Sequence, residues 1–163
     1  LYRDAEILSA LASVYGGPRT QDRLNEGWKH VLLNQFHDTL PGTHRPEGVA
    51  DIKRDYAQAF AIGHEVRDGA IAYLTGRLNA PNSDLAVFNT LAWERNALVE
   101  TDLRADVSAV RLGDETLPVQ HYADRTWFRT PALPALGWTV AAFAPEVKRA
   151  VTINWLSRAG SGR

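Results

Sequence analysis

An adjacent histidine and aspartate, His37 and Asp38, are the residues of this sequence best suited to chemistry, because imidazole and carboxylate both bind divalent metal ions. They follow an apolar helical pattern and precede a corner at Pro41 and Gly42. The negative end of a helix disfavours a carboxylate by ~0.3–1 kcal/mol and favours a protonated imidazole, whereas a bound dication reverses both tendencies. One histidine is not a complete site, since zinc takes four ligands, or three and a water. Taken alone, the pair favours a structural role, with His37 capping the helix and Asp38 forming the turn.

The other histidines carry weaker signals. His44, seven residues after His37, is a candidate second ligand, but nothing in the sequence fixes its direction. His30, His64 and His121 have no acidic or histidine neighbour at ligand spacing, so we expect them at surface or boundary positions. The sequence contains no nucleophile elbow, no glycine-rich phosphate loop and no HExxH motif.

Composition narrows the class of protein. The 163 residues are 45% hydrophobic and 23% charged, which is typical of a soluble globular chain. A formal net charge of -1 argues against nucleic acid or an anionic membrane as a partner. The absence of cysteine excludes disulfides and thiolate metal sites and fits a reducing, cytoplasmic compartment. The first residues do not form a signal peptide, no apolar run could span a bilayer, and the lack of any methionine suggests a piece of a longer product.

Three helical patterns in the first half must position His37 and Asp38. They cover residues 1–15, which end at Gly16, Gly17 and Pro18, then residues 22–36 and residues 46–76. The third carries a heptad-like stripe of Val49, Ile52, Tyr56, Ala59, Gly63, Val66, Ala70 and Tyr73. Because the connections are short, these patterns predict an antiparallel three-helix bundle.

The second half is predicted to be antiparallel β-structure and part of a sandwich. Its short β-leaning runs are residues 85–89, 97–101, 107–112, 117–122, 125–129 and 138–143, with a tight turn at 113–115. Its tryptophans should pack in a core or on a sheet face, with a sugar-stacking platform as the alternative; they are Trp93, Trp127, Trp138 and Trp155. The fold class is therefore α+β, with domains at 1–80 and 81–163, a boundary near 79–83 and a frayed tail at 159–163.

Residues 26–43, from Glu26 through the Asn-Gln-Phe-His-Asp-Thr-Leu-Pro-Gly-Thr run, closely resemble a signature of glycoside hydrolase family 38, the α-mannosidases. The run from Val87 to Arg95 resembles the opening of that family's β-sandwich region, and the resemblance extends over about residues 1–145. Thr39 stands where the family usually has isoleucine, and His44 and Arg45 replace a small, apolar pair.

The resemblance implies that residues 1–80 are the family's middle three-helix domain. It implies that His37 is one of four zinc ligands and that Asp38 binds hydroxyls of the mannose held on the zinc. The other ligands and both catalytic carboxyl groups belong to an N-terminal α/β domain that nothing here matches. We therefore expect part of a zinc-dependent retaining α-mannosidase, which hydrolyses terminal α-D-mannosyl residues of an oligosaccharide or glycoside. We expect no catalytic residue in this chain, no activity from it alone, and the missing N-terminal catalytic domain as its partner.

Two alternatives remain open. One is a noncatalytic helical module that binds a partner protein or glycan through a bundle face left exposed. The other is a plain α+β domain in which the His-Asp pair only caps a helix.

Overall fold

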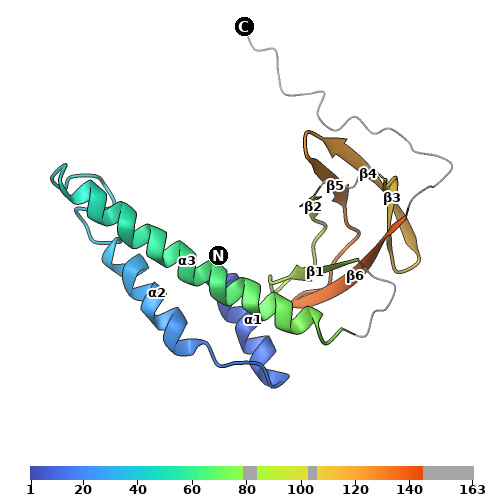
Figure 1. Cartoon of the computed structure of the whole chain (residues 1–163), viewed down its shortest axis with the longest axis horizontal. Helices are drawn as coiled ribbons and strands as arrows, with labels where there is room; N and C mark the ends of the chain where they lie inside the picture. Colours follow the sequence, from blue (N-terminus) through green and yellow to red (C-terminus); the bar gives the residue numbers. More distant parts are fainter. Residues whose placement is uncertain (79–83, 103–105, 145–163) are drawn as a thin grey trace, which may run out of the picture. The chain divides into compact units, whose positions relative to one another are not determined.

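The computed structural model describes residues 1–78, 84–102 and 106–144. The chain divides into two compact units, Leu1–Leu78 and Asn79–Arg163. The first is helical and the second is built from strands (Figure 1). The boundary expected at 79–83, the tail at 159–163 and Trp155 lie outside the described residues.

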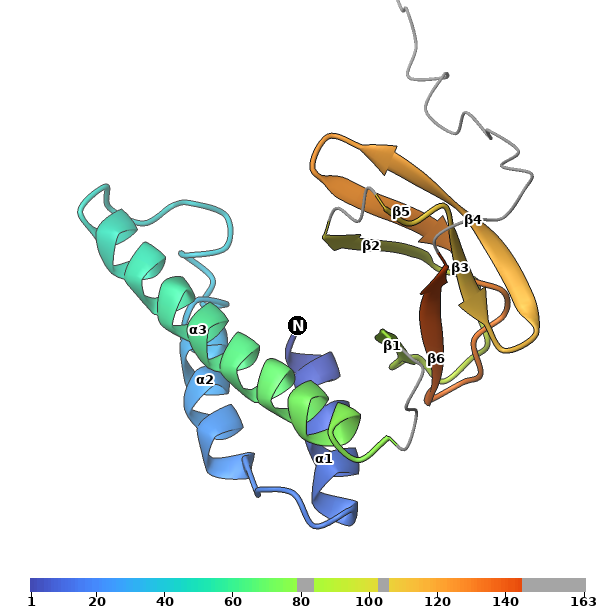
Figure 2. The same ribbon diagram turned by 45° about the vertical axis from the view of Figure 1, so that its right-hand side comes forward.

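The helical unit consists of α1 (Tyr2–Val14), α2 (Gln21–Leu33) and α3 (Gly48–Thr75). Both α1 and α2 pack along α3 and make few contacts with each other (Figure 2). The breaker after α1 acts as expected: Gly16 has φ +84°, and the Gly17 N–H donates to the Ala12 carbonyl at 2.8 Å. These features form a Schellman motif, which reverses the chain toward α2.

The core of the helical unit lies where α1, α2 and α3 meet. Its buried members are Tyr2, Ala5, Leu24, Ala59 and Val66, with Leu1, Trp28 and Val31 packed against them. The apolar stripe expected on α3 is buried only from Ala59 onward, and Val49 is exposed. The reason is the position of α1, because the Leu1 side chain lies against Gly63 and α1 covers only the later part of α3.

The end of α2 corrects one prediction. The helix stops at Leu33, three residues before the predicted residue 36, and a series of turns follows. Asn34 explains the stop. Its buried side chain donates to the His30 carbonyl at 2.9 Å, so this carbonyl of the last helical turn has a hydrogen-bond partner without a further turn of helix. The apolar segment before His37 is not buried, although its pattern is that of an amphipathic helix: Leu32, Leu33 and Phe36 are exposed.

The described residues of the second unit form a six-stranded sheet whose neighbouring strands are all antiparallel. The strands are β1 (Leu85–Asn89), β2 (Leu98–Asp102), β3 (Ala109–Leu112), β4 (Glu115–Tyr122), β5 (Arg125–Arg129) and β6 (Gly137–Ala144). Their order is β1-β6-β3-β4-β5-β2. Each predicted run contains a strand, and the predicted turn holds Gly113 at φ +58°. Helices followed by antiparallel strands confirm the α+β class.

The sheet is curled, so that its two ends share one core (Figure 2). That core contains Val110 and Leu112 of β3, Phe128 of β5, Ala141 of β6 and the loop residue Leu133. Side chains of β1 and β2, the two edge strands, pack against the same cluster. Within the described segments, no helix combines the length and apolar character needed to cross a bilayer.

Candidate functional site

His37 and Asp38 lie in the turns between α2 and α3. A short clasp organises this segment: the Thr43 N–H donates to the Asp38 carbonyl at 3.1 Å, and the Thr43 hydroxyl donates to Asp38 Oδ1 at 3.2 Å. The clasp closes the corner that contains Gly42, whose φ is +78°. Asp38 is thus both a turn former, as its residue type suggests, and a carboxylate held in a defined position.

The two side chains are adjacent and open to solvent. His37 Nε2 lies 3.6 Å from Asp38 Oδ2, and the side chains are 77% and 52% exposed. The His37 ring rests on Phe36, with 4.1 Å between the ring centroids. An exposed imidazole beside a carboxylate is chemically suited to a divalent cation, and its accessibility leaves room for ligands from elsewhere.

The described residues do not complete a metal centre. Over residues 1–78, 84–102 and 106–144, no three histidine or acidic side chains gather as a metal site would require. His44 is therefore not grouped with His37 and Asp38, and its Nδ1 instead lies 3.0 Å from the Arg45 carbonyl oxygen. The donor chemistry of His37 would suit one ligand of a zinc ion, with Asp38 beside it, and a complete zinc site would need further ligands from outside these segments.

Four large apolar residues close to the pair in sequence are more than half exposed; these residues, here called the apolar rim, are Leu32, Leu33, Phe36 and Leu40. All four lie within the same short stretch as His37 and Asp38, at the end of α2 and in the turns that follow. Several large exposed apolar side chains in one short segment are typical of a surface that another molecule or segment covers.

The remaining histidines have structural surroundings, as their sequence context predicts. His30 Nδ1 lies 3.4 Å from Asp55 Oδ1 and thereby links α2 to α3. His121 makes two contacts, Nε2 with the Val107 carbonyl at 2.8 Å and Nδ1 with the Thr126 hydroxyl at 3.1 Å. The His30–Asp55 pair has no local sequence signature, since its members meet only after α2 and α3 have packed together.

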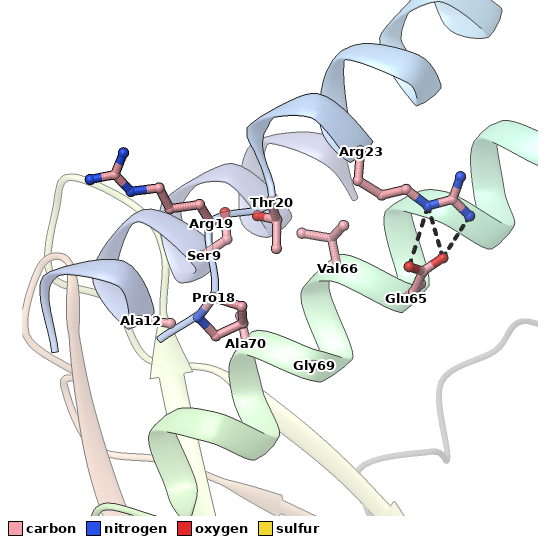
Figure 3. A pocket seen from close by; sticks show the side chains of 10 residues that line it. All are labelled: Ser9, Ala12, Pro18, Arg19, Thr20, Arg23, Glu65, Val66, Gly69 and Ala70. Atoms are coloured by element: carbon pink, nitrogen blue, oxygen red, sulfur yellow. Dashed lines mark hydrogen bonds and ion pairs between the residues drawn. The ribbon is translucent and has the colours of Figure 1, made fainter. Parts of the chain in front are cut away.

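A cavity of about 370 Å³ lies elsewhere in the helical unit, against α1, α3 and the start of α2 (Figure 3). Small and apolar residues such as Ala12, Pro18 and Ala70 line much of it. At its rim, Arg23 Nη2 lies 2.7 Å from Glu65 Oε2, and these hydrogen bonds hold the pKa of Glu65 below its ordinary value. The charges of Arg23 and Glu65 at the mouth of this cavity therefore neutralise each other.

Tyr2 is a buried residue with a polar group, and no sequence pattern marks it as important. Its hydroxyl donates to the Ala59 carbonyl at 2.7 Å, and burial raises the pKa of Tyr2. The ring fits against α2 because position 27 is glycine: a Cβ there would lie 1.9 Å from the Tyr2 hydroxyl oxygen. Gly27 lies in α2, the helix that directly precedes the His-Asp pair. The contact with Tyr2 therefore holds α2 in place.

Comparison with known proteins finds a family model and a curated relative that resemble this chain. A family model described as the α-mannosidase middle domain matches residues 1–74, which include α1, α2, the His-Asp turn and nearly all of α3. Over 103 residues the chain is 30% identical to mouse "Alpha-mannosidase 2C1". That match covers 61% of this chain and 10% of the mouse protein, so the chain spans about a tenth of the length of this curated relative.

Proposed function

Because residues 1–74 match the α-mannosidase middle-domain model, we propose that this chain is part of a zinc-dependent retaining α-mannosidase of glycoside hydrolase family 38. In this proposal the longer protein hydrolyses terminal α-D-mannosyl residues of oligosaccharides or glycosides. The chain supplies His37 as a metal ligand and Asp38 as a carboxylate that binds the sugar.

The exposed His37–Asp38 pair within its apolar rim is the observation that carries the proposal. A pair that only capped α2 would have its imidazole directed at the last carbonyl groups of the helix. Here Asn34 already occupies the His30 carbonyl, and the His37 ring lies on Phe36 instead. The imidazole is therefore not used as a helix cap and is available as a ligand.

Asp38 has the properties needed to bind a sugar. One of its carboxylate oxygens accepts from Thr43 and the other faces His37, so the group is oriented before any ligand arrives. An ionised carboxylate accepts strong hydrogen bonds from hydroxyl groups. A zinc ion held by His37 and by ligands from elsewhere would supply electrostatic orientation of the sugar hydroxyls.

The cleavage step itself is assigned to no residue of this chain. A retaining glycosidase uses two carboxyl groups about 5–5.5 Å apart, one as nucleophile and one as acid. We propose that both belong to an N-terminal catalytic domain, which covers the apolar rim and is the chain's partner. The absence of cysteine fits a reducing compartment, and we propose a cytoplasmic location.

The test uses the full-length protein. His37→Ala should lower bound zinc and the hydrolysis of an aryl α-mannoside, activity falling by at least roughly 100-fold since even indirect partners of a metal cost 10–100-fold. Asp38→Asn should keep the metal and raise KM. The matched control is His64→Ala, an exposed histidine on α3 that stacks on Phe60.

Near wild-type zinc content and activity in His37→Ala would overturn this assignment. The isolated chain should bind no zinc tightly and release no aryl group. If full-length His37→Ala stays active while substitutions at Leu33 and Leu40 abolish association with another protein, the alternative of a noncatalytic helical binding module is the correct one.

A further inference from the structure

Trp93 is held on a rigid loop at the end of β1. Asn89, which is 2% exposed, donates through Nδ2 to the Trp93 carbonyl at 2.9 Å and to the Pro134 carbonyl at 2.9 Å. Its Oδ1 accepts from the Leu91 N–H at 3.1 Å. A buried amide with this many partners fixes the backbone on both sides of it.

Backbone hydrogen bonds hold the same loop from outside. The Leu136 N–H donates to the Leu91 carbonyl at 2.8 Å, and Arg95 and Leu133 exchange two bonds of 3.2 and 2.8 Å. The chain is thus pinned before, at and after Trp93. A side chain on such a loop loses little conformational freedom when it binds a ligand.

The Trp93 side chain nevertheless faces water. It is 61% exposed, and across the described segments no aromatic ring packs on it. Two other tryptophans have ring partners: Trp28 donates to Glu6 at 2.7 Å and packs on Tyr2, while Trp138 lies beside Phe88 across the β1–β6 pair. Exposing a large indole on a rigid support has no structural benefit within this unit, so we expect the indole to contact either a ligand or another part of the longer protein.

Polar residues follow Trp93 in the sequence of its loop. Glu94, Arg95 and Asn96 come directly after it, and all three are exposed. An exposed indole on a loop that also carries hydrogen-bonding side chains suits a pyranose ring, which has an apolar C–H face and hydroxyl groups at its edge. A protein partner would need a more continuous apolar patch than this loop offers, although Leu136 on the facing loop is also exposed.

We propose that Trp93 is a sugar-contact residue that stacks on the pyranose ring of a mannose-containing glycoside, with Asn89 as its positioning residue. The choice of mannose rests on the proposed function above. The stacking itself depends only on the geometry of the β1 loop and needs no metal and no cleavage.

The experiment follows the indole N–H signals of the chain by nuclear magnetic resonance as methyl α-mannoside is added. The signal that is lost in Trp93→Ala identifies Trp93. We expect this signal to shift saturably in the unaltered chain. In the Trp93 variants, which lack the signal, binding is followed through the resonances of the sugar, and Trp93→Ala should bind roughly tenfold more weakly, the loss of one aromatic stacking contact. Trp93→Phe, which keeps a ring, should recover part of the affinity.

Trp138→Ala, which removes another exposed indole, is the matched control and should leave the affinity unchanged. Trp93→Ala should also keep its fold, since the side chain it removes is exposed. The proposal is overturned if no pyranoside shifts the Trp93 signal, or if Trp93→Ala binds the sugar as well as the unaltered chain. Because the readout is binding by the chain without zinc, its failure leaves the His37 test of the proposed function standing.

Discussion

At the scale of single residues, the closest fit in the helical unit is between Tyr2 and Gly27. The ring of Tyr2 occupies the space that any side chain at position 27 would need, and its hydroxyl reaches across to the Ala59 carbonyl. Three helices are thereby joined by one side chain. A helical glycine costs about 1 kcal/mol relative to alanine, so this contact is what justifies it.

Gly27→Ala should therefore destabilise the helical unit, against the usual gain from replacing a helical glycine. The added Cβ would lie 2.7 Å from Tyr2 Cζ and closer still to the hydroxyl, and overpacking of this kind costs about 1–3 kcal/mol. Urea unfolding followed by circular dichroism measures the change. Gly69→Ala on α3, where an added Cβ meets nothing within 4 Å, is the control and should be neutral or stabilising.

The residues of the candidate site differ in how far the sequence could predict them. His37 and Asp38 were identifiable because they are neighbours in a recognisable run. The Thr43 clasp on Asp38 and the pairing of His30 with Asp55 were not, because each depends on chain geometry that no local pattern encodes. Their positions follow from where α2 ends and how it packs on α3.

At the scale of elements, α2 and α3 are joined by an ion pair as well as by the core. Arg23 donates to Glu65 on α3 and to Glu26 on its own helix, at 2.7 and 2.6 Å. These hydrogen bonds lower the pKa of Glu65 from its ordinary value of 4.5. The pair is exposed, so its contribution to stability is small and sensitive to salt.

The pH dependence of this pair has a definite sign. Since the pKa of Glu65 is lower in the folded state, its contribution is complete above the ordinary value and is lost as the pH falls through the folded-state pKa. Glu65→Gln should therefore be less stable than the unaltered chain near neutral pH, and the difference should shrink toward zero in acid. Urea unfolding of both proteins at neutral and at acidic pH measures this difference in the free energy of unfolding.

Glu94→Gln, an exposed acid of the second unit, is the control for that comparison and should show no such difference in the helical signal. A Glu65→Gln difference that is the same at both pH values would contradict the assigned role.

Helix and strand positions were largely predictable, whereas strand order was not. Alternating patterns located all six strands, but the pairing of β1 with β6 depends on which ends of the sheet come together. The end of α2 was placed three residues late because the apolar spacing continues through Phe36. The Asn34 side chain overrides that spacing by taking the His30 carbonyl.

At the scale of the whole molecule, the two units have separate cores. Leu24 is buried in the helical core and Val110 in the sheet core, and neither cluster includes a residue of the other unit. The family match covers the helical unit alone, while the match to the mouse protein extends further along the chain.

Separate cores predict separate responses to mutation in the intact chain. Leu24→Ala should destabilise the helical unit by about 2–5 kcal/mol and raise its amide hydrogen exchange, with little change in the strands. Val110→Ala should do the reverse and serves as the matched control. Equal acceleration of exchange in both units by either variant would show that they unfold as one.

The fit between Tyr2 and Gly27 also constrains how this protein can evolve. A side chain can be gained at position 27 only in a lineage that has already lost the ring at position 2, because the reverse order passes through an overpacked intermediate. The two positions are therefore historically linked although they lie in different helices. Relatives that keep an aromatic residue at the first position should keep glycine at the second, whatever sugar they cleave.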